Sequence, residues 1–72
     1  MNAHTIKDSP TTGKTYTCVL NEQPLYDATV ESTKGCWATV KVVQPLPGKF
    51  SNQYKPGQVF DIKVQLYDFI EK

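Results

Sequence analysis

Apolar and polar residues alternate with a period of two in four separate segments of this 72-residue chain. A period of two is typical of strands that bury one face and expose the other. The segments are also rich in the β-branched and aromatic residues that strands favour. The sequence therefore predicts an all-β protein with strands over 15–20, 25–33, 36–42 and 58–67.

The chain length limits the protein to one small domain, because a chain of this size buries only about 60% of the surface that it exposes when unfolded. Residues 1–13 carry turn formers and almost no apolar side chains beyond Ile6, so we expect a flexible N-terminal arm before a single β domain at 14–72. A flat open sheet of this length would not be stable. We expect a small antiparallel barrel or a strongly curled sheet of four to five strands, of the size of OB-type and SH3-like barrels.

Turn formers separate the predicted strands. Asn21–Pro24 interrupts the alternation, and Thr33-Lys34-Gly35 predicts a tight hairpin that pairs the second and third segments antiparallel. Residues 44–57 form a long connection that contains proline and glycine, with room for a short strand over 49–54. Residues 68–72 either extend the last strand or form a final helical turn.

The charge pattern narrows the classes of partner. Eight lysines, no arginine and a net charge of +1 do not favour sequence-specific reading of duplex nucleic acid. Neither a membrane span nor a signal-peptide core is visible, so we expect a cytoplasmic protein that does not bind membranes. In that compartment Cys18 and Cys36 are expected to be reduced, buried thiols, with a disulfide as the alternative.

Catalytic and metal-binding groups are sparse. His4 is the only histidine and lies in the polar arm, while alternation places both cysteines on the inner face. Acid-base, nucleophilic and zinc chemistry all need several such groups close together. We therefore expect a protein that is not an enzyme and that uses no metal or cofactor.

The outward face of the third and fourth segments combines aromatic and lysine side chains. Such a mixture suits base stacking beside a phosphate backbone, so we expect a site for single-stranded nucleic acid. The expected binding residues are Trp37, Lys41, Lys63 and Tyr67 on the strand face, with Phe50, Tyr54 and Lys55 on the rim of the neighbouring loop.

Two other interpretations of this face remain open. The same residues are typical of an ordinary solvated strand face, with the tryptophan packed under a loop. They are also typical of a protein-protein interface. In that case the chain would be an accessory subunit or a small inhibitor of viral or mobile-element origin, or a homodimer paired through an edge strand.

Overall fold

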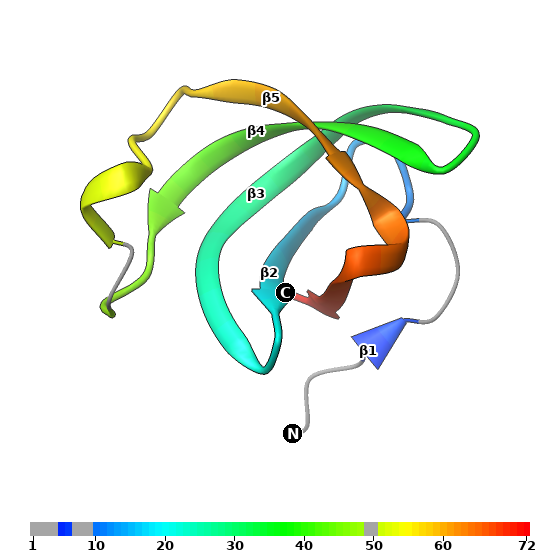
Figure 1. Cartoon of the computed structure of the whole chain (residues 1–72). Coiled ribbons are helices and arrows are strands. Elements are labelled where there is room, and N and C mark those ends of the chain that lie inside the picture. The colour runs from blue at the N-terminus through cyan, green and yellow to red at the C-terminus, as the bar shows by residue number, and fades with distance from the viewer. Residues whose placement is uncertain (1–4, 7–9, 49–50) are drawn as a thin grey trace.

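The computed structural model describes residues 5–6, 10–48 and 51–72, and its main feature is a six-stranded antiparallel sheet (Figure 1). The strands lie in the order β1-β6-β2-β3-β4-β5. Two short 3-10 turns interrupt the later part of the chain. The elements are β1 (Thr5–Ile6), β2 (Thr15–Leu20), β3 (Gln23–Lys34), β4 (Trp37–Pro45), η1 (Ser51–Gln53), β5 (Val59–Lys63), η2 (Val64–Leu66) and β6 (Tyr67–Glu71).

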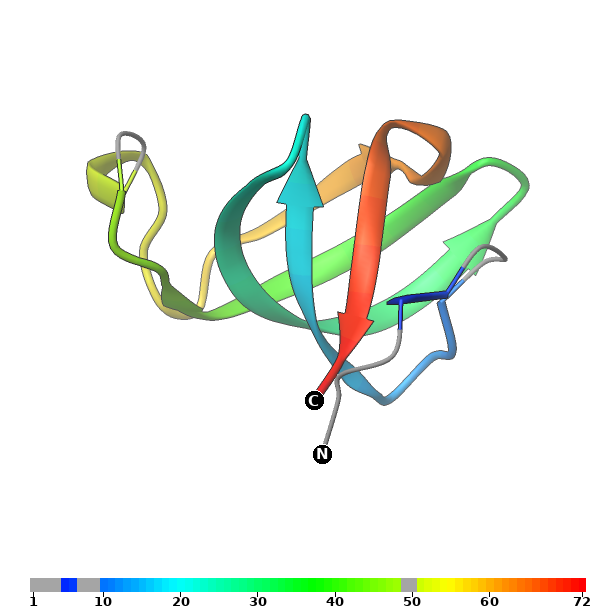
Figure 2. The same ribbon diagram turned by 90° about the horizontal axis from the view of Figure 1, so that it is seen from below.

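The sheet is strongly curled. β5 and β6 are separated in sequence only by η2, yet β5 pairs with β4 while β6 pairs with β2 on the opposite side of the sheet. A three-residue turn can join these strands only if the two sides of the sheet come close together. Figure 2 shows β3 bending between them. The all-β prediction is confirmed, but β5 and β6 are not hydrogen-bonded neighbours, so the sheet is not closed.

Two tight hairpins hold β2, β3 and β4 together. Asn21 and Glu22 connect β2 to β3, and their φ angles of 51° and 64° are those of a type I′ turn. Gly35 and Cys36 connect β3 to β4, and the φ of 59° at Gly35 fits the first central position of a type II′ turn. The predicted antiparallel pairing of the second and third segments is confirmed.

The core lies on the inner side of the curled sheet, where the inward positions of the alternating segments meet. This supports one small all-β domain. The buried core residues are Tyr16, Cys18, Leu25, Tyr26, Ala28, Val30, Ala38, Val40, Val42, Ile62 and Phe69. Cys36 was expected among them and is instead exposed, because it lies in the hairpin rather than in β4. Both cysteines are free.

The predicted single strand over 58–67 is wrong. η2 divides it after Lys63, and its three residues change which side of the chain faces the core. Tyr67 therefore packs inward, with its ring centroid 6.3 Å from that of Phe69. Residues 68–71 continue in β6 rather than forming a helical turn.

The predicted connection at 44–57 contains η1 over Ser51–Gln53 where a short strand was expected, and residues 49 and 50 lie outside the described part. At the N-terminal end, β1 pairs with β6, and the Gly13 N–H donates to the Val30 carbonyl at 2.7 Å. Neither 3-10 turn in the described ranges is long and apolar enough to span a membrane.

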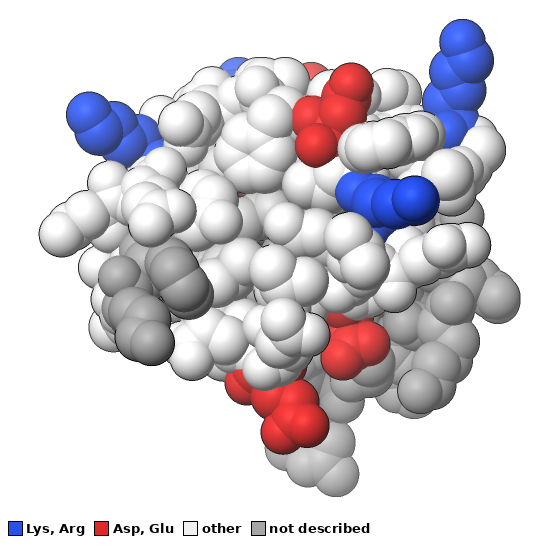
Figure 3. Space-filling view, in the orientation of Figure 1, with Lys and Arg blue, Asp and Glu red and all other residues white. Residues whose placement is uncertain are grey.

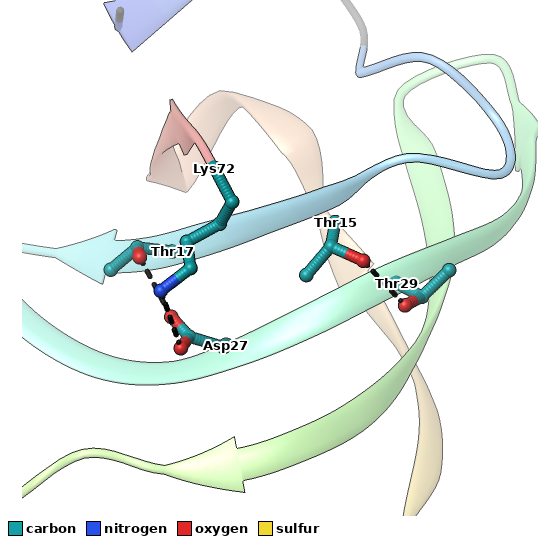
Figure 4. A network of polar contacts seen from close by, with 5 residues as sticks. All are labelled: Thr15, Thr17, Asp27, Thr29 and Lys72. Atoms are coloured by element: carbon teal, nitrogen blue, oxygen red, sulfur yellow. Dashed lines mark hydrogen bonds and ion pairs between the residues drawn. The ribbon is translucent and has the colours of Figure 1, made fainter. Parts of the chain in front are cut away.

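A buried carboxylate links β2, β3 and the C-terminal residue (Figure 4). Asp27 is only 2% exposed. It accepts hydrogen bonds from Thr17 Oγ1 at 2.7 Å and from Lys72 Nζ at 3.0 Å. Burying a carboxylate is costly unless it is hydrogen-bonded and paired, and this arrangement supplies both kinds of partner.

Candidate binding face

The outward side chains of β3, β4 and β5 form one continuous surface, because Trp37 and Thr39 of β4 each lie opposite a residue of β3 and a residue of β5. Between these outward positions lie Ala38, Val40 and Ile62, which point into the core. We call this surface the outer face. It consists of Ser32 and Lys34 of β3, Trp37, Thr39 and Lys41 of β4, and Val59, Asp61 and Lys63 of β5.

A tryptophan flanked by two lysines is the most distinctive part of the outer face. Lys34 of β3 and Lys63 of β5 are the cross-strand partners of Trp37. Directly opposed residues have Cβ atoms about 5 Å apart, so both ammonium groups can reach the surroundings of the indole. Trp37 is 48% exposed. Its ring is therefore available to a flat ligand, with positive charge on both sides.

The adjacent row of the outer face is polar. Ser32, Thr39 and Asp61 are cross-strand neighbours there, and Thr39 Oγ1 donates a hydrogen bond to Asp61 Oδ1 at 2.5 Å. No other described residue donates to the second carboxylate oxygen of Asp61. Together with the row of Trp37, these residues border an open groove of about 650 Å³, lined by Ser32, Lys34, Gly35, Cys36, Trp37, Thr39 and Asp61.

Only part of the expected site is assembled on this face. Trp37, Lys41 and Lys63 share it, as predicted from the alternation. Tyr67 does not, because it lies on β6 and packs against the core. Burial raises the pKa of its hydroxyl, as expected for a ring that is partly removed from water.

The expected rim lies away from Trp37. The Tyr54 ring packs against Tyr26 with centroids 4.6 Å apart, and Lys55 belongs to a turn in which its N–H donates to Gln58 Oε1 at 3.0 Å. Gly57, two residues after Lys55 in that turn, donates its N–H to the carbonyl of Val42 of β4, whereas Trp37 begins the strand. In Figure 1 this loop and the β3–β4 hairpin occupy opposite ends of the molecule. Phe50 lies outside the described residues.

Lys34 and Asp61 were not among the predicted site residues. Lys34 was assigned to the hairpin turn, although a two-residue loop at 35–36 places it opposite Trp37. Asp61 lies on the polar side of the alternating segment 58–67, the same side as Lys63, but was given no role. Its position two residues from Lys63 is a signal that the sequence contains.

Charge is mixed rather than concentrated on the side of the molecule that faces the viewer in Figure 1. Figure 3 shows separate basic and acidic side chains with uncharged surface between them. Long-range attraction of a polyanion is therefore weak, in keeping with the net charge of +1. The groups that the outer face offers to a ligand act at short range, through stacking and local ion pairs.

The described residues contain no group of three or more histidine, cysteine or acidic side chains close enough to hold a metal ion. Burial raises the pKa of the Cys18 thiol to about 12, and the nearby Asp27 carboxylate adds to the shift. The thiolate is the reactive form of cysteine, so the buried thiol of Cys18 is chemically quiet at neutral pH.

We compared the chain with protein-family models, curated proteins and solved structures, and found no match among them.

Proposed function

We propose that this protein is a non-catalytic binding module that holds single-stranded nucleic acid on its outer face. The observation that carries the proposal is the row formed by Lys34, Trp37 and Lys63. A base can stack on the exposed indole, while the lysines on either side neutralise the phosphates before and after it. Base stacking of this kind contributes about 1–3 kcal/mol per base, so one such platform gives a modest affinity.

The other residues of the outer face define the kind of recognition we expect. Thr39 and Ser32 offer hydroxyl groups, and the free oxygen of Asp61 can accept a hydrogen bond from the amino group of a base. The carboxylate also repels phosphate, which favours a base rather than the backbone at that position. We therefore expect weak sequence preference, with cytosine or adenine bound better than thymine.

Fluorescence of the only tryptophan tests this proposal. Single-stranded oligo-dC added at low salt is expected to change the emission of Trp37 at micromolar concentrations. Because two or three lysines contact phosphate, the logarithm of the affinity should fall with that of the salt concentration with a slope of about −1.4 to −2.1. No change at low salt would contradict the proposal.

A matched pair of variants separates the outer face from general electrostatics. Lys34→Ala combined with Lys63→Ala removes two charges from the row of Trp37, whereas Lys14→Ala combined with Lys55→Ala removes two exposed charges elsewhere. The first double variant should bind oligo-dC at least tenfold more weakly, and the second should bind nearly as the parent does. Equal losses would show that binding is not localised on this face.

The open edge of β5 favours a second candidate function, which is protein binding. β5 pairs only with β4 among the described residues, and Val59 at its start is 54% exposed. An extended segment of another protein can add to such an edge through backbone hydrogen bonds. An accessory subunit or a small inhibitor would use the protein in this way, and either would leave the tryptophan emission insensitive to oligonucleotide.

A further inference from the structure

β5 is the longer of the two open edges of the sheet. β1, at the other edge, has two residues, whereas β5 has five. Short edge strands offer little to a pairing partner, so β1 is a poor template and β5 a better one. The edge that can best accept a further strand is therefore Val59–Lys63.

The hydrogen bonds beside β5 show which of its residues face the open edge. The Val64 N–H donates to the Cys36 carbonyl and the Val42 N–H donates to the Gln58 carbonyl, both at 2.8 Å. Hydrogen-bonded and non-hydrogen-bonded pairs alternate along an antiparallel ladder. Phe60 and Ile62 therefore bond to β4, and the backbone groups of 59, 61 and 63 point away from it.

The residues whose backbone groups point away from β4 are also the residues whose side chains lie on the outer face. Val59, Asp61 and Lys63 alternate with the inward Phe60 and Ile62. A charged edge usually discourages pairing with other strands. Here, however, an acid and a base stand two residues apart, and such a pair is complementary to its own copy when the copy runs in the opposite direction.

We propose that β5 pairs antiparallel with β5 of a second copy of this chain, with the two-fold axis at Ile62. In this register Asp61 faces the partner's Lys63, and Lys63 faces the partner's Asp61. Opposite charges directly across an antiparallel pair stabilise it, while like charges destabilise it. This inference rests on protein binding, the second candidate function above, and identifies a second copy of this chain as the partner at the β5 edge.

The charges distinguish this register from one competing register. Pairing centred on Asp61 would form more backbone hydrogen bonds, but it would place the two Asp61 carboxylates opposite each other. Pairing centred on Ile62 replaces that repulsion with two ion pairs. It also brings the start of one β5 near the η2 turn of the other, so that exposed Val59 lies close to the partner's η2, which carries the exposed Leu66.

The dimer would extend the outer face across both copies. Trp37, Lys63, the partner's Asp61 and the partner's Thr39 would form one row, and the two-fold axis would generate its equivalent. Two tryptophan platforms would then lie on one continuous sheet. A single-stranded ligand long enough to reach both would bind bivalently, which raises the apparent affinity without new contacts.

Charge-swap variants test the interface by sedimentation equilibrium over a range of protein concentrations. Asp61→Lys and Lys63→Asp each place like charges opposite one another, and each should weaken the dimer by roughly a hundredfold. A mixture of the two variants restores both ion pairs, so it should form a heterodimer. In the double variant D61K/K63D, residue 61 of each copy again faces an opposite charge at residue 63 of the other copy, so this variant should form a homodimer.

Lys41→Asp changes charge on the outer face away from the edge, so it should leave the dimer intact, and circular dichroism checks that each variant is folded. A parent protein that stays monomeric at millimolar concentration would overturn the inference. Single variants that remain dimeric would also overturn it, and a monomeric D61K/K63D would exclude the register centred on Ile62. Trp37→Ala leaves Asp61 and Lys63 in place, so a loss of oligonucleotide binding by this variant without a loss of the dimer tests the nucleic-acid proposal separately.

Discussion

Trp37 of β4 and Lys63 of β5 are direct cross-strand neighbours on the outer face of the sheet. The residues come from parts of the chain that are far apart in sequence, and the pairing of β4 with β5 brings them together. Lys34 completes the row from the other side. An exposed indole between two ammonium groups is the arrangement on which the proposed function depends.

Trp37→Ala is expected to weaken binding of single-stranded DNA by about 10- to 100-fold, because stacking on one aromatic ring contributes about 1–3 kcal/mol. The fold should be little affected, since the side chain is half exposed. Fluorescence anisotropy of a labelled oligonucleotide measures the loss without relying on the tryptophan. Trp37→Phe serves as the control and should retain most of the affinity. Equal affinities for Trp37→Ala and the parent would show that the indole is not a binding platform.

The part of this face that depends on local alternation was predicted from the sequence, and the part that depends on pairing between distant segments was not. Alternation is a local property, so it predicted β2, β3 and β4 and placed Trp37, Lys41 and Lys63 on one face. Alternation could not show that the strand ends after Lys63. The apolar period continues through Val64 and Leu66, but β6 pairs with β2, and that long-range pairing requires the chain to turn at η2.

Tyr67 and Lys34 show the two ways in which the site prediction departed from the structure. Tyr67 was counted along an unbroken strand, and the three residues of η2 moved it to the core side. Lys34 was assigned to a turn, although β3 continues through it and the loop is only Gly35 and Cys36. Both departures concern where a strand ends, which depends on pairing partners rather than on local composition.

Asp27→Ala should lower the free energy of unfolding by about 2 kcal/mol, because it removes a buried acceptor and leaves the Thr17 hydroxyl without its partner. Lys72→Ala should cost less, since the lysine side chain is half exposed and water screens the ion pair. Urea denaturation at neutral pH measures both changes. Asp68→Ala, on an exposed position of β6, is the matched control. A loss for Asp27→Ala no larger than that of the control would contradict this role.

Stability should fall at alkaline pH because of the buried thiol of Cys18. Its pKa rises from an ordinary value of 9.0 to about 12 in the folded protein. The unfolded chain therefore releases this proton first as the pH rises. The stability that the buried thiol contributes is complete below pH 9 and is lost progressively as the pH approaches 12.

Urea midpoints at pH 7.5, 9 and 10 test this dependence on the parent and on Cys18→Ala. The variant should lose less stability between pH 7.5 and 10 than the parent does, whatever its stability at neutral pH. Burial also raises the pKa of Tyr26, which adds a further loss above about pH 10 in both proteins. Parallel pH profiles for the two proteins would exclude Cys18 as the source.

Glu22→Gly is expected to stabilise the protein by about 0.5–1 kcal/mol. Glu22 has a φ of 64°, a left-handed conformation that costs a residue with a Cβ about 1–2 kcal/mol but costs glycine little. The greater freedom of glycine in the unfolded chain offsets part of the gain. The opposite kind of change in the other hairpin, Gly35→Ala at a φ of 59°, should destabilise the protein by about 1 kcal/mol. Thermal unfolding would contradict the turn assignment if the two variants shifted the midpoint in the same direction.

Mapping of backbone amide shifts by two-dimensional NMR tests the binding face most directly. We expect addition of single-stranded oligo-dC to shift the indole N–H of Trp37 and the amides of residues 32–41 and 59–63, while the amides of β2 and β6 stay in place. Oligo-dC that shifts no signals, or that shifts only those of residues 51–58, would contradict the assignment of the outer face as the site of nucleic-acid binding.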